Sequence, residues 1–290
     1  MEKIGMIGLG TMGHSIAQNI MDHGYPMVLY DIRPEAMADL VAKGAEAAAS
    51  PEELGTKVNT VLVIVNAYKH CVSALTPLFT TMHSGTVIQM STISQEDAKS
   101  LEQMASAAGV TMLDCPVSGG SAGAKAGTLT LMAAGSDELY GKYLPLLQTF
   151  GTKIVHCGDK VGQGQAVKAI NQLLVGIHMC ATAEAFTLAK KCGLDEQLVY
   201  DTIRNSAGNS NIFSNRGQFL IDRDFSTRST LAIQMKDTDI ACRTGDAVGA
   251  ATPLANVARE IFKLSLQKYP PTDDSLSVAR LYEELSGLEL

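Results

Sequence analysis

An amine and two amides recur at helical spacing near the middle of the chain. Lys168 is followed three and four residues later by Asn171 and Gln172, so a helix would carry all three on one face. The amine of such a group can take or give a proton, and the amides can hold a hydroxyl or a carboxylate. Considered by itself, Lys168 has a simpler interpretation as a solvated lysine in the first turns of a helix. Other motifs in the chain are needed to distinguish a functional lysine from a solvated one.

A glycine-rich motif follows a short apolar strand that is predicted at residues 3–7. In a dinucleotide-binding turn the first glycine permits a tight turn, the second lets the backbone approach a pyrophosphate, and the third lets the next helix pack against the strand. The N–H groups at the start of that helix then face the phosphates. The motif predicts a site for NAD or NADP, formed by Gly8, Leu9, Gly10, Thr11, Met12 and Gly13.

The end of the second predicted strand bears on the choice between NAD and NADP. This strand, at residues 25–30, is followed by Asp31, 18 residues beyond Gly13, where a ribose 2′-hydroxyl needs an acceptor. A carboxylate there favours NAD, because it repels the 2′-phosphate of NADP. Arg33 could instead pair with that phosphate, so NADP stays open as the alternative.

Two further strand ends are predicted to meet at the same edge of the sheet. Residues 58–65 form an uninterrupted apolar strand of the kind that a parallel sheet buries on both faces, and its end carries Val65 and Asn66. The strand at 86–89 is followed by Ser91 and Thr92. Doubly wound sheets bind ligands at this edge, so we expect the Thr92 hydroxyl within reach of a nicotinamide. Ser91 could instead cap the helix that begins nearby.

A third polar segment, Ser118-Gly119-Gly120, follows a strand predicted near residue 114. Successive backbone N–H groups and a hydroxyl form an anion-binding nest that suits a carboxylate. The same residues, with Pro116 close by, are equally well explained as ordinary turn chemistry.

The elements that must position these side chains fall into two groups. Strands and helices alternate as far as residue 156 and predict an α/β Rossmann domain with a doubly wound, mostly parallel sheet over residues 1–160. A helix of about 28 residues, roughly 40 Å long, should then link the domains and end before Gly193. The domain at 161–290 is predicted to be all-α, with helices at 196–205, 210–221, 231–248, 254–267 and 276–285, and with a turn opening at Met235-Lys236-Asp237.

Composition excludes several classes of protein. The net charge of −7 and the pI near 5.4 argue against a nucleic-acid-binding face. The six cysteines lie far apart, show no metal-ligand spacing with histidine, and are expected to be reduced. No apolar run approaches the length of a membrane span, and the N-terminus leads directly into the glycine motif, so we expect a cytoplasmic protein that binds neither membrane nor metal. The apolar helix faces exceed the needs of one small bundle and favour a homodimer or homotetramer.

Together the motifs resemble the β-hydroxyacid dehydrogenase family, which holds 3-hydroxyisobutyrate dehydrogenase and tartronate semialdehyde reductase. Four motifs match in order across nearly the whole chain, at 8–13, 114–120, 164–171 and 236–237. The resemblance implies an NAD(P)-dependent oxidoreductase that interconverts a small hydroxy acid and its oxo acid or semialdehyde in a cleft between the domains. It implies Lys168 as catalytic acid/base. A lysine normally has a pKa of about 10.4, and we expect burial in the closed cleft to lower this pKa toward roughly 7–8. It also implies substrate contacts from Ser118, Gly119, Gly120, Asn171 and Gln172, and contacts with the nicotinamide end of the cofactor from Thr92 and Lys236.

Departures from the family pattern bear on the substrate. Val65-Asn66-Ala67 replaces the usual Leu-Pro, Gln172 replaces the second of two asparagines, and no tryptophan follows Ser210. The segments 171–178, 207–210 and 215–216 look most like the L-threonate dehydrogenase branch, in which the oxidised carbon would be α to the carboxylate. The alternatives are a 3-hydroxyisobutyrate dehydrogenase, a tartronate semialdehyde (2-hydroxy-3-oxopropionate) reductase and, in another class, a non-catalytic dinucleotide-binding module.

Overall fold

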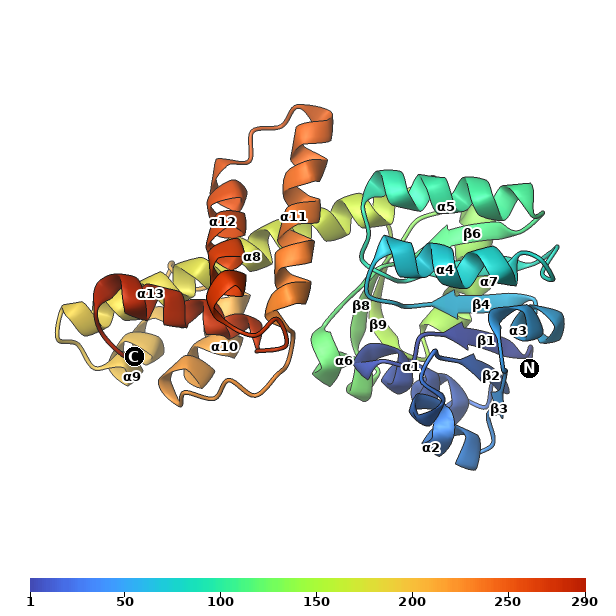
Figure 1. The fold of residues 1–290 in the computed structure, drawn as a ribbon, viewed down its shortest axis with the longest axis horizontal. Helices are drawn as coiled ribbons and strands as arrows, with labels where there is room; N and C mark the ends of the chain where they lie inside the picture. The colour runs from blue at the N-terminus through green and yellow to red at the C-terminus, as the bar shows by residue number, and fades with distance from the viewer. The chain divides into compact units, whose positions relative to one another are not determined.

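The computed structural model describes all of residues 1–290 and divides them into two compact units, Met1–Lys168 and Ala169–Leu290 (Figure 1). The division lies inside the long helix α8 (Gln163–Lys191), a few residues beyond the boundary near residue 160 that the sequence predicts. The first turn of α8 is hydrogen-bonded to the first unit, which is why that turn belongs there.

The first unit is built on a six-stranded parallel sheet with the order β3-β2-β1-β4-β5-β6. The order reverses between β1 and β4, which is where doubly wound sheets bind ligands. This arrangement confirms the predicted Rossmann fold. The strands are β1 (Ile4–Ile7), β2 (Met27–Tyr30), β3 (Glu46–Ala47), β4 (Thr60–Val63), β5 (Thr86–Gln89) and β6 (Thr111–Asp114).

Helices cover both faces of this sheet, so the strands are apolar on both sides. The alternation of β1 shows this directly, because Met6 lies in the core with Ile16 of α1 whereas Ile7 lies in the opposite core with Leu75 of α4. The α5 helix begins at a capping box in which Ser94 Oγ accepts from Asp97 N (3.0 Å). The helical segments are α1 (Thr11–Asp22), η1 (Pro34–Met37), α2 (Ala38–Ala42), α3 (Pro51–Lys57), α4 (Tyr68–Leu78) and α5 (Gln95–Ala107).

The last strands of the first unit form a small separate sheet rather than an extension of the large one. Its order is β7-β8-β9, antiparallel between β7 and β8 and parallel between β8 and β9. A single bridge between Asp114 and Ala134 connects it to β6. Pro116 lacks an N–H group and therefore cannot donate to a continued ladder. The elements are β7 (Val117–Ser118), α6 (Gly120–Ala126), β8 (Leu129–Ala133), α7 (Asp137–Leu147) and β9 (Gly151–His156).

The long helix α8 is present as predicted, with 29 residues. Gly193 follows it with φ +70°, and the side chain of Asp195 accepts from Leu198 N (2.8 Å) to cap the next helix. Part of its apolar stripe is exposed, with Val167, Ile170 and Leu174 40, 61 and 47 % exposed. By length and composition alone α8 could cross a membrane, but half of its most apolar window is buried within the protein, and a single helix of this kind is weak evidence for a membrane span.

The second unit consists of helices, as predicted. The segment 235–237 departs from the prediction, because it lies within α11 and does not open a turn. The Thr230 side chain accepts from Ile233 N (3.2 Å) and starts this helix five residues before Met235. The helix predicted at 276–285 is divided into a 3-10 helix at 275–277 and an α-helix at 278–286. The elements are α9 (Glu196–Ile203), α10 (Asn211–Ile221), α11 (Leu231–Val248), α12 (Pro253–Lys268), η2 (Ser275–Ser277) and α13 (Val278–Ser286).

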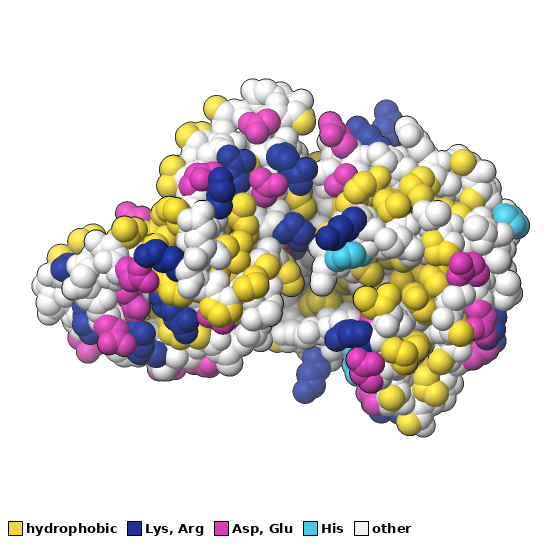
Figure 2. Space-filling model, in the orientation of Figure 1, with side chains coloured by type: hydrophobic (Ala, Val, Ile, Leu, Met, Phe, Trp, Pro, Cys, Tyr) yellow, Lys and Arg dark blue, Asp and Glu magenta, His cyan; other side chains and the backbone are white.

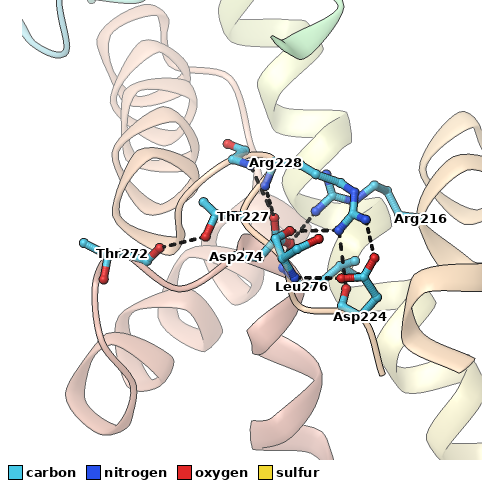
Figure 3. A network of polar contacts seen from close by, with 9 residues as sticks. Arg216, Asp224, Thr227, Arg228, Thr272, Asp274 and Leu276 are labelled. Atoms are coloured by element: carbon cyan, nitrogen blue, oxygen red, sulfur yellow. Dashed lines mark hydrogen bonds and ion pairs between the residues drawn. The ribbon is translucent and has the colours of Figure 1, made fainter. Parts of the chain in front are cut away.

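A buried carboxylate fixes the loop between α10 and α11 (Figure 3). Asp274 is fully buried, and its side chain accepts from Leu276 N (2.9 Å) and Arg228 N (2.7 Å) and pairs with the Arg216 guanidinium. Arg216 is one of the residues that resemble the L-threonate branch. Here it stabilises the fold, because a buried carboxylate requires such partners.

Candidate active site

The three glycines of the first motif differ in whether the surrounding protein leaves room for a side chain. A Cβ atom on Gly8, which has φ +94°, would lie 2.2 Å from the Ile64 carbonyl oxygen, and one on Gly13 would lie 2.0 Å from the Gly8 carbonyl oxygen. A Cβ on Gly10 would have no neighbour within 4 Å. The fold therefore needs Gly8 and Gly13, whereas the space beside Gly10 is open to a ligand.

The start of α1 fits an anionic group. Gly10 occupies the N-cap position and no side chain caps the helix, so the first-turn N–H groups and the positive end of the helix dipole are left for other acceptors. Thr11 is exposed and Met12 packs against the apolar core. These features suit the pyrophosphate of a dinucleotide.

Asp31 connects the glycine turn to the end of β2. It is 8 % exposed, and its Oδ2 accepts from Leu9 N (2.7 Å) while Oδ1 accepts from Arg33 N (2.9 Å). The Arg33 guanidinium lies 3.5 Å from Oδ1 and is itself 58 % exposed. The sequence pointed to Asp31 as a ribose acceptor, but the bond to Leu9 appears only in the structure.

The ends of β4 and β5 are joined through Ser91. Its Oγ accepts from Val65 N (2.8 Å), and the Gln89 amide binds both the N–H (2.5 Å) and the carbonyl oxygen (3.0 Å) of Ser91. Ser91 is therefore a buried connector and not the helix cap, which is Ser94. At this edge Asn66 is exposed, whereas Val65 and Thr92 are half-buried.

A buried carboxylate that sequence reasoning did not single out holds the start of α8. Asp114 Oδ2 accepts from Gly162 N (3.1 Å) and Gln165 N (3.0 Å), and Oδ1 accepts from Gln165 Nε2 (2.8 Å). Gln165 also donates to Ser91 O (3.1 Å) and accepts from Ile93 N (3.1 Å). Burial raises the pKa of Asp114 to about 6, against the opposing effect of its N–H donors. The only feature of the sequence that could have indicated this role is that Asp114 is a carboxylate at the end of an apolar strand.

Lys168 follows Gln165 by three residues, almost one turn along α8. The residue is 6 % exposed, so the interpretation as a solvated surface lysine is wrong. A Cβ on Gly164 would lie 2.3 Å from the Met132 carbonyl oxygen, which shows how closely the helix start approaches β8. Together with the bonds of Asp114, this contact holds the turn that carries Lys168.

The predicted anion nest joins β7 to α6. Ser118 ends β7 opposite Thr130, and the next two residues have φ +131° (Gly119) and φ +63° (Gly120), a conformation that favours glycine. Both glycines are exposed and Ser118 is half-buried.

In the second unit the predicted amides lie beside a carboxylate of α11. Gln172 is 7 % exposed, and its Nε2 donates to Asp237 Oδ2 (2.5 Å). Asn171 Nδ2 donates to Gln172 Oε1 (2.7 Å), and Lys236 Nζ lies 2.8 Å from Asp237 Oδ1. The structure thus brings Asn171, Gln172 and Lys236 together through Asp237, to which the sequence analysis assigned no role.

Two family models cover most of the chain. Residues 3–158 match the NAD-binding domain of 6-phosphogluconate dehydrogenase, and residues 162–282 match the NAD-binding domain of NADP-dependent 3-hydroxyisobutyrate dehydrogenase. The L-threonate dehydrogenase of Pectobacterium atrosepticum is 34 % identical over 98 % of this chain and 95 % of that protein. The chain belongs to the β-hydroxyacid dehydrogenase family.

Other members of the family are similar over comparable lengths. The 3-hydroxyisobutyrate dehydrogenase of Pseudomonas aeruginosa is 32 % identical over 97 % of this chain and 99 % of that protein. The crystal structure of a 3-hydroxyisobutyrate dehydrogenase from Salmonella typhimurium superposes with a TM-score of 0.89 at 33 % identity, covering 97 % of this chain and all of that one. The protein is thus an NAD(P)-dependent hydroxyacid dehydrogenase with the fold of this family.

Proposed function

We propose that this dehydrogenase oxidises L-threonate with NAD and that Lys168 is its catalytic acid/base. The observation that carries the proposal is the polar face of α8, where a buried lysine is followed by a half-buried and a buried amide. The choice of L-threonate is supported by the L-threonate dehydrogenases of Pectobacterium atrosepticum and Cupriavidus necator, which are 34 and 33 % identical over nearly the whole chain.

Oxidation of the alcohol requires the loss of a hydride from carbon and of a proton from oxygen. When bound, NAD accepts the hydride. The Lys168 amine accepts the hydroxyl proton and returns it in the reverse direction, which requires the amine to be neutral in the oxidising state. The substrate carboxylate is held by Ser118, Gly119 and Gly120, whose conformation suits an anion. Asn171 and Gln172 hold the hydroxyl groups.

The dinucleotide is held mainly by the first unit in this proposal. The turn from Gly8 to Gly13 receives the pyrophosphate, supported by the open space at Gly10. Asp31 and Arg33 face the adenosine ribose, and the carboxylate favours NAD over NADP. Val65, Asn66, Thr92 and Lys236 contact the nicotinamide end.

A second candidate substrate is 3-hydroxyisobutyrate, supported by the relative from Pseudomonas aeruginosa that is 32 % identical over nearly its full length. Steady-state oxidation of L-threonate, 3-hydroxyisobutyrate, glycerate and serine, each with NAD and NADP, separates the two. We expect the highest kcat/KM for L-threonate with NAD. A higher value for 3-hydroxyisobutyrate would replace the first proposal by the second, and no turnover of any acid would overturn both.

We further propose a cytoplasmic homodimer or homotetramer. Apolar side chains are exposed on α8 and on α12, including Ile170, Leu254 and Val257, each more than 60 % exposed, and apolar side chains are visible on the face of the helical unit drawn in Figure 2. Burial of such a surface between copies is a common reason for assembly. Analytical ultracentrifugation tests this proposal, and a monomer at micromolar concentration would contradict it.

A further inference from the structure

Asp237 is a buried carboxylate to which the proposed mechanism assigns no role. It lies in α11, is 4 % exposed, and contacts two residues that the mechanism does use. Its Oδ2 accepts from Gln172 Nε2 (2.5 Å) and its Oδ1 pairs with Lys236 Nζ (2.8 Å). The two helices are close here, because a Cβ on Gly176 of α8 would lie 2.7 Å from Thr238 Oγ1.

The chemistry of a carboxylate dictates the direction of this hydrogen-bond chain. A carboxylate can only accept hydrogen bonds, so the side chain of Gln172 must turn its NH2 group to Asp237 and its oxygen away. That oxygen in turn accepts from Asn171 Nδ2 (2.7 Å), which directs the oxygen of Asn171 away from Gln172. A primary amide without such a neighbour could bind in either orientation, as donor or as acceptor.

We propose that Asp237 is a positioning residue that makes α8 present amide oxygens to the substrate. Through Gln172 and then Asn171, it selects acids that carry hydroxyl groups besides the one that is oxidised, because a hydroxyl can donate to these oxygens and a methyl group cannot. The proposal rests on the proposed function, in which Asn171 and Gln172 contact the substrate. Buried polar groups that lose their partner discriminate strongly between such substrates.

The test compares Asp237→Asn with the wild type on two acids. An asparagine at 237 can turn its own NH2 group toward Gln172, which frees both amides of α8 to reverse. We expect kcat/KM for L-threonate to fall about 10-fold, mainly through KM, because one hydrogen-bond acceptor is lost. We expect less than about a 2-fold change for 3-hydroxyisobutyrate, which has no second hydroxyl to lose a bond. Equal losses for both acids would overturn the proposal.

A double-mutant cycle separates this relay from a purely structural role. Gln172→Met keeps the size of the side chain but removes its amide, and should show the same loss with L-threonate. Asp237→Asn combined with Gln172→Met should lose no more than either variant, because both interrupt one chain. Additive losses would mean that Asp237 acts independently of Gln172 and would contradict the proposal.

The chain contains a matched control. Gln218 Nε2 donates to Gln197 Oε1 (3.0 Å), and Gln197 Nε2 donates to Asp201 Oδ2 (3.2 Å), which repeats the amide–amide–carboxylate order at an exposed aspartate. Asp201→Asn should leave kcat/KM for both acids unchanged. A loss of selectivity in this control as great as in Asp237→Asn would refute a specific role for Asp237.

A readout that does not need turnover keeps this proposal separate from the proposed function. In the 15N-labelled enzyme, the side-chain NH2 signal of Gln172 is the one that disappears in Gln172→Met. We expect Asp237→Asn to shift this signal and to speed its hydrogen exchange at least 10-fold, because the carboxylate acceptor is gone. If the wild type oxidised neither acid, the proposed function would fail, but the NH2 signal of Gln172 would still test the hydrogen-bond chain from Asp237. An unchanged signal in Asp237→Asn would overturn that chain.

Discussion

Gly164→Ala adds a single methyl group, yet the structure predicts a large effect on stability and turnover. A Cβ at this position would lie 2.3 Å from the Met132 carbonyl oxygen, 3.0 Å from Asp114 Oδ2 and 3.2 Å from Pro116 Cδ, and real Cβ contacts essentially never fall below 3.0 Å. The start of α8 must therefore move by at least about 0.7 Å relative to β8. No flexible side chain can absorb this shift, because the closest atom belongs to the backbone of β8.

Such a movement breaks the hydrogen bonds that Asp114 makes to the helix start. Its bonds to Gly162 N (3.1 Å) and Gln165 N (3.0 Å) would lengthen beyond hydrogen-bonding range. Each bond to a charged group contributes about 1.5–3 kcal/mol, and removing a helical glycine returns about 0.5–1 kcal/mol. We expect a net loss of about 3 kcal/mol in the free energy of unfolding, or roughly 6–12 °C in Tm.

The same displacement of the helix start should also move the amine of Lys168. Lys168 lies almost one turn beyond Gln165, and a misplacement of about 1 Å can lower a rate about 100-fold. The assays are thermal unfolding and steady-state oxidation of L-threonate. The control is Gly141→Ala in α7, where a Cβ would meet nothing within 4 Å, and which should gain about 0.5 kcal/mol. A Gly164→Ala variant with wild-type Tm and kcat would show that the helix start is not held as we describe.

Three further outcomes are expected. Lys168→Ala should leave NAD binding, measured by calorimetry, within about 2-fold of the wild type while kcat falls by about 100-fold or more; equal activity would end its assignment as acid/base. Gly10→Ala should leave Tm unchanged, since its Cβ would meet no atom within 4 Å, yet weaken NAD binding about 10-fold or more because the backbone can no longer approach the phosphates; unchanged affinity would place the pyrophosphate elsewhere. Asp114 has a pKa raised from 3.8 to about 6 in the folded protein, so between these values the folded state binds a proton that the unfolded state has released. The contribution of Asp114 to the free energy of unfolding therefore falls by about 3 kcal/mol as pH rises from about 4 to about 6, at 1.36 kcal/mol per pKa unit. Denaturant unfolding of Asp114→Asn at several pH values should lack this decrease. If the free energy of unfolding varied with pH in the same way in both proteins, the sign of this effect would be contradicted.

Local patterns in the sequence were sufficient to predict those elements whose conformation is set by residues close together in the chain. The glycine motif between an apolar strand and a helix predicted the nucleotide turn, because the three glycines recur at a fixed short spacing between those two elements. The long helix and its end at Gly193 followed from apolar periodicity and a C-terminal glycine. The bounds of β5 at 86–89 and of α11 at 231–248 agree with the prediction for the same reason.

Contacts between distant segments were not visible in those patterns. The turn predicted at Met235 was wrong, because Lys236 and Asp237 lie inside α11, which already begins at the Thr230 cap. The separate three-stranded sheet depends on pairing between β8 and β9, which are separated by the whole of α7. Arg216 looked like a marker of the substrate, but its ion pair with Asp274, 58 residues away, gives it a structural role.

The sequence by itself therefore determined the class of fold, the nucleotide motif and the family, since each depends on residue types at short, regular spacing. Only the tertiary structure decided which polar side chains are held, and by what. Asp114 binds Gln165 across 51 residues, and Gln172 binds Asp237 across 65. A buried carboxylate must find donors wherever the fold supplies them, and no spacing along the chain reveals which donors those are.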